Sequence, residues 1–319
     1  DIKNALKMID IAKSSAVNAI KFQTFKASEL ISDHNQKYTY KSQGKKVTES
    51  MLDMFKRYEL DKEDWKKIKK RCDEKKILFL STPQNKTDLD LLLNLKITAI
   101  KVGSDDLTNL PLIKEYSSTG LPLFLSCGMA DLSEISTSLN TIGSFDGYPT
   151  VLLHTTSQYP TPEKDVNLLK LKTLQNTFPN IPVGFSDHTQ GPLASSLAVA
   201  LGAVIFEKHF TLDNNLLGPD HWFSENPLGL KQWCKNIKKS HAMLGNSLLK
   251  PTNTEIENKN EFRRFIVAIR DIQKNEVFSR KNIGMRRTSQ KNSLPPLFFE
   301  FLLGRKSVKE FSKGKSIQL

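Results

Sequence analysis

Two histidines, His188 and His209, stand at the ends of two short apolar runs and have acidic residues close by. The run over 181–185 ends in Ser-Asp-His, and the run over 204–206 ends in Glu-Lys-His. Imidazole suits manganese, iron and zinc, and neighbouring strands would bring both rings within reach of one ion. Two histidines without cysteine leave positions free for water and substrate, which is typical of a Lewis-acid site. We therefore predict a metal site at His188 and His209.

Two lysines and a set of hydroxyl groups predict an anion site. Lys21 and Lys101 each lie inside an otherwise apolar run, where a buried ammonium is costly unless it is paired. A lysine that reaches the rim or forms an internal salt bridge is the alternative. Singly, each hydroxyl could cap a helix; together with the lysines they could bind phosphate or carboxylate. The hydroxyls that end five apolar runs are those of Thr82, Ser104, Ser126, Ser157 and Ser186.

Further polar side chains near these run ends could hydrogen-bond a polyol. They are Gln23, Asp106 and Tyr159. The roles of His221 and Trp222 stay open at this point.

The elements that must position these residues are short strands alternating with helices. Segments with helical spacing, such as 60–72, 86–93 and 168–178, separate most of the apolar runs, which indicates parallel βα units. In a βα barrel the carboxyl ends of all strands lie on one rim, where catalytic residues gather. The seven expected strands cover residues 19–25, 77–82, 99–104, 122–127, 151–157, 182–188 and 204–209.

The strand count favours a (β/α)8 TIM barrel whose first strand lies upstream of Asp1. A closed parallel barrel needs eight strands, and the chain opens with a helical pattern over 1–16. An open doubly wound sheet is the alternative, but no glycine-rich dinucleotide fingerprint follows any of the apolar runs.

The chain divides into a barrel over 1–245, a polar linker over 246–262 and a small domain over 263–319. The last segment contains short strand-like pieces at 265–269 and 277–278. A segment of this size is marginal as an independent folding unit, so we expect it to pack against the barrel or a partner subunit.

Composition and charge exclude several classes of protein. The formal net charge is +13, but the densest basic run, over 62–76, interleaves acids with bases and indicates a solvated helix face. No recognition motif for nucleic acid accompanies the charge, which would instead attract small anions. No apolar stretch is long enough for a membrane span, and the first residues do not form a signal peptide. Three widely spaced cysteines indicate reduced thiols and a cytoplasmic protein.

Several segments resemble the sialic acid synthase family, which comprises N-acetylneuraminate synthase and its legionaminate and pseudaminate relatives. They occur in the family's order over about 1–245, and the segment from Arg263 is similar to the family's small antifreeze-like (SAF) domain. The segments are AIKFQTF, FLSTP, IKVGS, SCGM, LLHTTSQYPTP, VGFSDHT, ALGAVIFEKHFTLD and GPDH.

The resemblance implies a barrel joined to an SAF domain in a domain-swapped homodimer. It implies condensation of phosphoenolpyruvate with an N-acylated hexosamine such as N-acetylmannosamine, giving a nine-carbon 2-keto sugar acid and phosphate. His188 and His209 correspond to ligands of Mn²⁺, with Mg²⁺ or Co²⁺ as alternatives. Phosphoenolpyruvate would bind at Lys21, Thr82, Lys101, Ser104, Ser126, Ser157 and Ser186. The sugar would bind at Gln23, Asp106, Tyr159, Asp220 and, from the partner's SAF domain, Arg287.

The chain departs from the family pattern at positions near the substrates. Asp106 replaces the usual glutamate, Ser157 replaces an asparagine, and Arg286-Arg287-Thr288 replaces Arg-Pro-Gly. The family's catalytic glutamate lies on the strand expected upstream of Asp1. We therefore expect the 319-residue chain alone to be inactive and poorly folded, because an open barrel exposes an unpaired edge.

Two other functions are consistent with the same residues. One is a different metal-dependent barrel enzyme, a lyase or hydrolase that uses His188 and His209. The other is a non-catalytic sugar-binding protein in which the SAF-like segment serves as a binding module.

Overall fold

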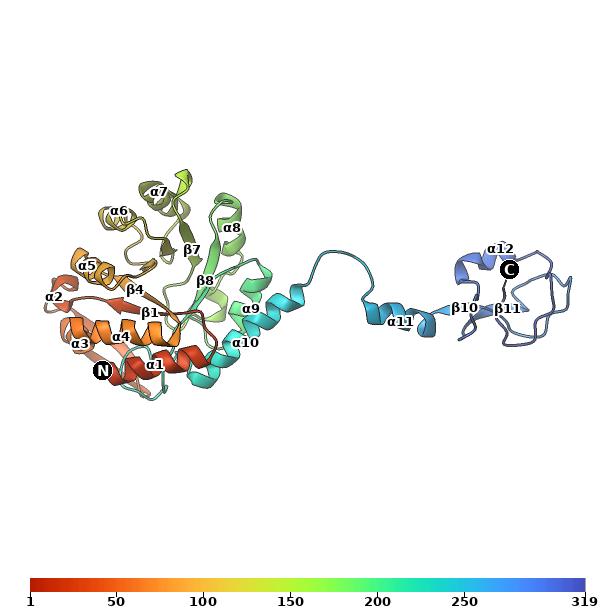
Figure 1. Cartoon of the computed structure of the whole chain (residues 1–319), viewed down its shortest axis with the longest axis horizontal. Coiled ribbons are helices and arrows are strands. Elements are labelled where there is room, and N and C mark those ends of the chain that lie inside the picture. The colour runs from red at the N-terminus through yellow and green to blue at the C-terminus, as the bar shows by residue number, and fades with distance from the viewer. Residues whose placement is uncertain (319) are drawn as a thin grey trace. The chain divides into compact units, whose positions relative to one another are not determined.

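The structure is a computed structural model that describes residues 1–318, with the side chain of residue 260 not included. The chain forms two compact units, Asp1–Gly245 and Asn246–Leu319, and each is treated by itself (Figure 1).

The first unit is built on seven parallel strands, and all seven predicted strands are present. The strands form two hydrogen-bonded sets, β1-β4 and β5-β6-β7-β8-β9, and β4 lies beside β5. Spatial neighbours follow chain order without a reversal, which argues against a doubly wound sheet. The prediction of an eighth strand concerns residues outside this chain and stays a prediction. The bounds are β1 Ala19–Thr24, β4 Leu78–Pro83, β5 Ile100–Val102, β6 Leu123–Ser126, β7 Thr150–His154, β8 Val183–Asp187 and β9 Phe206–Lys208.

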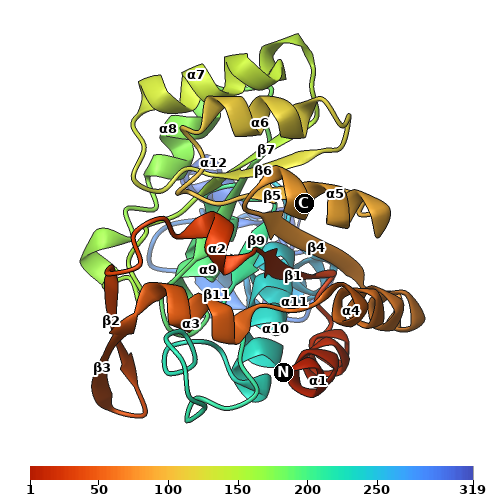
Figure 2. The same cartoon turned by 90° about the vertical axis from the view of Figure 1, so that its left-hand side faces the viewer.

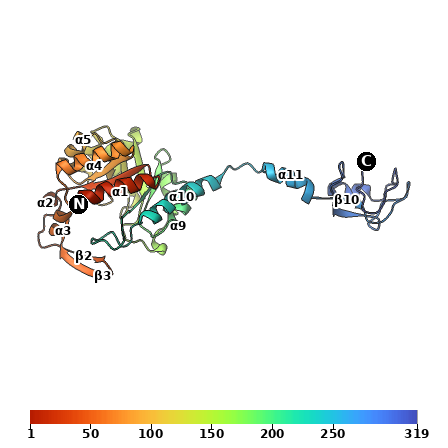
Figure 3. The same ribbon diagram turned by 60° about the horizontal axis from the view of Figure 1, so that its bottom comes forward.

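Helices cover the outside of these strands, as Figure 2 shows. They include α5 (Lys86–Asn94), α6 (Leu110–Ser117), α7 (Leu132–Ile142) and α8 (Lys170–Thr177). Figure 3 shows α1 (Ile2–Ser14) beside α4 (Lys62–Lys75), and α9 (Leu193–Ala200) beside α10 (Pro227–Leu244). Among the described residues, none of the helices combines the length and the apolar character that a membrane span requires.

Helix α4 illustrates why the charged segments fold as they do. Asp61 caps its first turn by accepting from the backbone N–H of Asp64, and its inward side buries Trp65, Ile68 and Cys72. Four of its lysines pair with acids three or four residues away, as in Lys66 with Glu63 at 2.7 Å. The prediction of a solvated helix face is confirmed.

A β-hairpin between β1 and α3 (Met51–Tyr58) was not predicted. Strands β2 (Lys37–Ser42) and β3 (Lys45–Ser50) join through Gln43-Gly44, both at positive φ, as a type I′ turn requires. The sequence hides the hairpin because its residues are mostly polar and charged, and the only alternation is that of Tyr38 and Tyr40 in the first strand. A short helix, α2 (Ala27–Leu30), precedes it.

The hairpin is attached to the loop that follows β9. The Gly218 N–H donates to Ser42 Oγ at 3.2 Å, and Gln43 Nε2 donates to the Asn215 carbonyl at 2.8 Å. These bonds hold the hairpin beside the loop that follows β9, at the carboxyl ends of the strands.

The second unit has its own apolar core beneath the antiparallel pair β10 (Arg264–Ala268) and β11 (Ile283–Arg287). The predicted linker over 246–262 is not all irregular, because α11 (Asn253–Phe262) begins at a capping box made by Thr252 and Glu255. The strand-like piece predicted at 277–278 forms only one isolated β-bridge, between Val277 and Lys306. Helix α12 (Phe299–Leu302) completes the core, which comprises Ile266, Ala268, Ile272, Phe278, Ile283, Phe299, Leu302, Phe311 and Ile317.

Candidate active site at the carboxyl ends of the strands

Two lysines from separate strands meet at one carboxylate inside the first unit. Lys21 Nζ on β1 lies 3.0 Å from Glu207 Oε2 on β9, and Lys101 Nζ on β5 lies 4.0 Å from Glu207 Oε1. The Lys101 side chain is only 4% exposed. The contact between Lys21 and Glu207 brings the first and last strands of the first unit, β1 and β9, together at this point.

The pKa values of Glu207 and Lys101 are set by burial and by the unequal distances of the two lysines from the Glu207 carboxylate. Burial opposes ionisation of Glu207, but Lys101 and Lys21 outweigh it and hold the pKa of the carboxyl well below its usual range. Desolvation lowers the pKa of Lys101 to about 8, although Glu207 pulls it upward. Desolvation wins at Lys101 because Glu207 is nearer to Lys21. The group therefore carries one net positive charge at neutral pH.

Two of the predicted hydroxyls belong to the same cluster. Lys101 Nζ donates to Ser126 Oγ at 2.7 Å, and Ser186 Oγ donates to Glu207 Oε1 at 2.8 Å. Both serines are buried. Each hydroxyl therefore has one strong partner and can turn toward an anion that displaces it.

Two further hydroxyls flank Gly128, just beyond β6. The Gly128 N–H donates to Ser104 Oγ at 3.0 Å, and a Cβ at this glycine would lie 2.4 Å from Ser157 Oγ. Within the described part of the chain, Ser157 Oγ is buried without a hydrogen-bond partner. A buried hydroxyl that lacks a partner is costly, and it is satisfied when a polar ligand enters.

The structure places the other polar candidates around this cluster. Thr82 is buried and pairs in register with Gln23, whose side chain is exposed. Asp106 follows β5, accepts from Asn109 Nδ2 at 3.1 Å, and has a pKa raised by burial. In the described part of the chain, neither Gln23 nor Asp106 forms a hydrogen bond or an ion pair with the histidines or with Lys21 and Lys101.

The two histidines lie together, with ring centroids 5.2 Å apart. The Thr156 carbonyl lies 2.8 Å from His188 Nδ1, and since a carbonyl only accepts, Nδ1 carries the proton and Nε2 keeps its lone pair. Burial lowers the pKa of His188, and it lowers the pKa of His209 to about 3. Both rings are thus neutral, and one is oriented by a carbonyl as metal-binding histidines are.

The residues present fit a divalent cation with open positions. Among residues 1–318, no group of three His, Cys, Asp or Glu side chains is placed to bind one metal ion. The prediction of a metal site therefore rests on the His188 and His209 pair alone. Asp220 Oδ2 is 3.8 Å from His209 Nδ1 and is the nearest acid. Desolvation by the surrounding protein raises the pKa of Asp220 to about 6, although 53% of its side chain is exposed to solvent.

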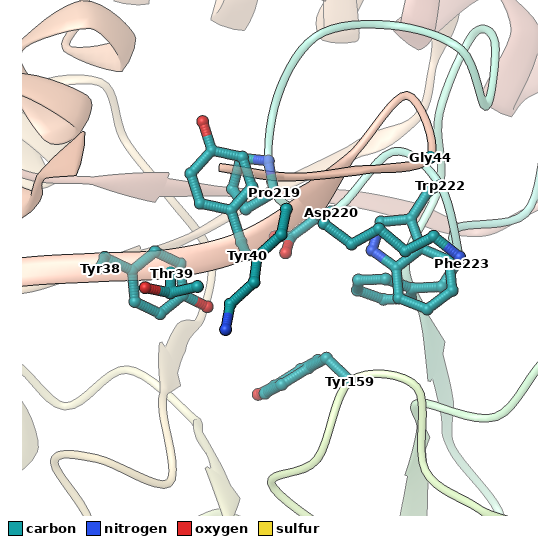
Figure 4. Close-up of a pocket in the computed structure, with 11 residues that line it drawn as sticks. Tyr38, Thr39, Tyr40, Gly44, Tyr159, Pro219, Asp220, Trp222 and Phe223 are labelled. Carbon is teal, nitrogen blue, oxygen red and sulfur yellow. The ribbon is translucent and has the colours of Figure 1, made fainter. Parts of the chain in front are cut away.

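A cavity of about 470 Å³ opens beside the histidines. Tyr159 forms its floor, with its ring centroid 4.3 Å from that of His188 and 5.6 Å from that of His209. Figure 4 shows Tyr159 facing the hairpin and the loop that carries Asp220. The lining residues are Tyr38, Thr39, Tyr40, Lys41, Gly44, Lys46, Tyr159, Pro219, Asp220, Trp222 and Phe223.

A buried ion pair lies directly behind the histidines. Lys208 Nζ is 3.0 Å from Asp187 Oδ2, with side chains 2% and 0% exposed. Asp187 also accepts from Ser195 Oγ on α9, which in turn accepts from Trp233 Nε1 on α10. The residues that precede His188 and His209 are therefore fixed to each other and to two helices.

The predicted sugar residue Arg287 lies in the second unit, at the end of β11. Its guanidinium carbon is 5.5 Å from the ring centroid of Phe262. Its assignment to a site shared with a partner stays a prediction.

Sequence reasoning left out two parts of the site. Glu207 was noted only as a neighbour of the histidines, although an acid in a three-residue strand is as unusual as the lysines are. The hairpin residues Tyr38 and Tyr40 were missed altogether. Their signal was the alternation of aromatic residues in KYTYKS before a Gln-Gly turn.

Comparisons with known proteins identify the family of the chain. The family model described as "NeuB family" matches residues 8–248. The N,N'-diacetyllegionaminic acid synthase of Campylobacter jejuni is 37% identical over 320 residues, covering 100% of this chain and 95% of that protein. Its Legionella pneumophila counterpart is 33% identical, covering 99% and 89%. The N-acetylneuraminic acid (sialic acid) synthetase structure from Leptospira borgpetersenii, in complex with citrate, has a TM-score of 0.72 and 33% identity, covering 82% of this chain and 87% of that chain.

Proposed function

Because the chain belongs to the NeuB family of sialic acid synthases, we propose that it is a nonulosonic acid synthase. In the proposed reaction, phosphoenolpyruvate condenses with an N-acylated hexosamine aldehyde to give a nine-carbon 2-keto sugar acid and phosphate. The observation that supports it is a site in two parts. One part is a cationic cluster of Lys21, Lys101 and Glu207 with buried hydroxyls around it, and the other is a neutral histidine pair beside a cavity of about 470 Å³.

The lysines and hydroxyls suit the anionic substrate. Lys21 and Lys101 provide ammonium groups, and charge-assisted hydrogen bonds to phosphate or carboxylate are among the strongest in proteins. Ser126 Oγ accepts from the Lys101 ammonium, and Ser186 Oγ donates to the Glu207 carboxylate that holds the lysines. Ser104 and Ser157 offer two hydroxyls beside a glycine that leaves room for the ligand. In this proposal Thr82 lines the same substrate.

The histidine pair suits the aldehyde substrate. His188 and His209 would hold a divalent cation, proposed as Mn²⁺ with Mg²⁺ or Co²⁺ as alternatives, which when bound polarises a carbonyl oxygen. Tyr159 and Asp220 border the same space and would hydrogen-bond sugar hydroxyls, together with Gln23 and Asp106. These side chains orient the aldehyde carbon toward phosphoenolpyruvate.

The bonds made and broken balance in this scheme. C3 of phosphoenolpyruvate attacks the aldehyde carbon, and the aldehyde oxygen takes a proton to become a hydroxyl. Water adds at C2 and loses a proton, and the bond between C2 and the phosphate oxygen breaks. The products are a 2-keto acid and phosphate, and no oxidant or reductant is needed.

The second unit is proposed as an SAF domain, and the assembly as a homodimer in which Arg287 serves the partner's site. Size-exclusion chromatography with light scattering tests the assembly: a monomer at micromolar concentration would contradict it.

A product assay tests the function. The protein at its native length is incubated with phosphoenolpyruvate, Mn²⁺ and a panel of N-acylated hexosamines, and products are identified by mass spectrometry. We expect a nine-carbon 2-keto acid and an equal amount of phosphate. Phosphate release without carbon–carbon bond formation would identify a hydrolase instead. Sugar binding without any product would favour the binding protein.

A metal-binding measurement tests the histidines independently of turnover. The His188→Ala, His209→Ala double variant should lose Mn²⁺ binding in electron paramagnetic resonance titrations, while its circular dichroism spectrum is retained. The matched control is His34→Ala, an exposed histidine of the same unit. Unchanged Mn²⁺ binding by the double variant would contradict the metal site.

A further inference from the structure

We propose that one face of the second unit docks the protein on an anionic lipid surface. This docking face consists of Leu297, Phe301, Arg305 and Lys306, with Arg280 at its edge. None of these residues belongs to the strand-end site of the first unit, so this contact with lipid is independent of the proposed reaction.

The apolar part of the docking face is a short helical segment. It comprises the 3-10 turn η3 (Pro296–Phe298) and α12, which follows it. Phe299 and Leu302 are buried in the core of the second unit, whereas Leu297 and Phe301 are 85% and 50% exposed. A helix that is apolar all round is typical of a segment that is buried on every side or lies in a membrane. The outward side of this segment therefore indicates a further apolar contact.

The charge of the second unit is strongly positive. Residues 246–319 contain 16 lysines and arginines against 7 aspartates and glutamates, and thus carry 9 of the 13 net positive charges of the chain. Glu300, the acid within the apolar segment, is paired with Arg280. In the part of the chain that the structure describes, Arg305 and Lys306 form no ion pair. Both are exposed and can therefore face an anionic partner.

Arg305 joins the charged and the apolar parts of the docking face. Its Nε donates to the Phe301 carbonyl at 2.9 Å, and its guanidinium carbon lies 3.8 Å from the centroid of the Phe301 ring. Lys306 follows it in the chain and pairs with Val277 in the isolated β-bridge, which fixes its backbone. At a lipid surface the apolar side chains can enter the boundary of the acyl chains while the cations stay level with the headgroups.

A lipid surface fits the docking face better than a second copy of the chain does. In a symmetric contact between two copies, each residue of the face would lie near its own counterpart, so Arg305 and Lys306 would meet like charges. An anionic membrane offers negative charge to every cation at once and an apolar layer below it. The cavity of about 550 Å³ that Arg287 lines shares no residue with the docking face, so the role proposed for Arg287 is not affected.

Co-sedimentation with vesicles tests the docking face. The protein at its native length is mixed with vesicles of phosphatidylcholine, either alone or together with phosphatidylglycerol. We expect binding to the anionic vesicles at low salt, little binding to the neutral ones, and release as the ionic strength approaches about 1 M, where charges are screened. The Leu297→Glu, Phe301→Glu variant should bind anionic vesicles about 10-fold or more weakly, because it loses the apolar contact and adds two negative charges. The Arg305→Gln, Lys306→Gln variant should weaken binding by about 10-fold.

Matched variants separate the docking face from the overall charge. Leu249→Glu, Ile256→Glu makes the same change in net charge at two exposed apolar residues elsewhere in the second unit. Lys291→Gln, Lys315→Gln does the same for the glutamine variant at two exposed lysines. Both controls should keep most of the vesicle binding. Equal losses in the face and control variants would show that overall charge binds the lipid, and would overturn the proposal.

Three other results would also overturn it. One is the absence of any binding of the unmodified protein to anionic vesicles. Another is conversion of a dimer into a monomer by Leu297→Glu, Phe301→Glu in light scattering, which would assign the docking face to a second copy. The third is binding to polyglutamate that is as tight as binding to the vesicles and is lost in the same variant, which would indicate an acidic protein partner.

Two measurements keep these outcomes distinct from damage and from failure of the proposed function. All the variants change exposed side chains, so their circular dichroism spectra should match that of the unmodified protein. The condensation assay of the unmodified protein without vesicles decides the proposed function, whatever the vesicles show.

Discussion

Glu207 is the residue on which the anion half of the site depends. It lies between Lys21 and Lys101, which hold the pKa of its carboxyl well below its usual range, and it accepts from Ser186. Without it, two ammonium groups would share a poorly hydrated space. The carboxylate therefore stabilises the arrangement of the lysines before any ligand arrives.

Replacing Glu207 tests this role. Glu207→Gln leaves Lys101 buried without its counter-charge, and we expect the free energy of unfolding to fall by about 3 kcal/mol, as for other broken buried pairs. Urea titration measures the change. The control is Glu63→Gln, which breaks the exposed pair with Lys66 and should cost less than about 1 kcal/mol. Similar losses in both variants would contradict the role given to Glu207.

The pKa of Lys101 predicts how substrate affinity depends on pH. Since its ammonium titrates near pH 8 in the free protein, phosphoenolpyruvate affinity should decline as the pH rises above about 8. The folded pKa lies below the unfolded one, so Lys101 makes the fold more stable, not less, as the pH rises from about 8 toward 10.5. Unfolding therefore cannot account for the decline.

Isothermal titration calorimetry between pH 7 and 10 follows this affinity. Lys101→Met should bind phosphoenolpyruvate more weakly, by about 10-fold or more, and should lose the inflection near pH 8. A variant that binds weakly but keeps the same inflection would assign the titration to another group.

Gly128 should be needed for ligand binding more than for folding. In Gly128→Ala the new methyl would meet Ser157 Oγ at 2.4 Å and Ser104 Oγ at 2.8 Å, and both hydroxyls can rotate away. We expect little change in Tm and about 10-fold weaker phosphoenolpyruvate binding. A double-mutant cycle checks the cause, because Gly128→Ala should add little once Ser157→Gly has removed the hydroxyl. Full additivity would contradict the contact.

At the scale of elements, the buried pair Asp187–Lys208 fixes the two metal-site strands in register. Asp187 pairs with Lys208 across β8 and β9, so the histidines that follow each of them leave the sheet at matching positions. Lys208 Nζ also donates to the carbonyl of Gly191, which begins the turn into α9. The orientation of the histidine pair thus depends on a contact on the other face of the sheet.

Breaking this pair should affect both stability and metal binding. We expect Lys208→Met to lower the free energy of unfolding by about 3 to 5 kcal/mol and to weaken Mn²⁺ binding by about 10-fold or more, as changes behind metal ligands do. Chemical denaturation and Mn²⁺ titration measure the two effects. Lys172→Met, an exposed lysine of α8, is the control. Loss of stability with unchanged Mn²⁺ affinity would give the pair a structural role alone.

The strands could be predicted from the sequence because each is an apolar run that ends in polar residues. Strand β8 shows this most clearly, since all five of its residues are buried. The hairpin could not be predicted in this way, because it contains no apolar run, and its residues Tyr38 to Lys41 line a cavity instead of packing in the core. The hairpin contacts the cavity and the loop over 213–223, which is distant in sequence, and the sequence alone does not show that these segments meet.

At the scale of the whole molecule, the chain folds as two units with separate cores. The first core draws on strands and helices from all of 1–203, whereas the second is made of nine buried side chains. The sequence predicted the boundary near 245 from the change to polar residues. It did not predict α11, because polar residues with good helix propensity read equally well as an unstructured linker.

Removing the second unit tests this independence. The protein at its native length but without residues 246–319 should unfold cooperatively with a Tm within about 5 °C of the first-unit transition of the intact protein, since domains with separate cores fold alone. Differential scanning calorimetry measures both. Loss of the cooperative transition would show that the first core depends on the second unit.

The base of the hairpin has a consequence for how such enzymes diverge. The Met51 N–H donates to the Gln36 carbonyl at 2.9 Å, so the segment over 37–50 starts and finishes at one point. It can be lengthened, shortened or exchanged without displacing the strands that hold the lysines and histidines. An exchange of this segment between relatives would therefore change one wall of the cavity beside the histidines and leave the strands beneath it in place.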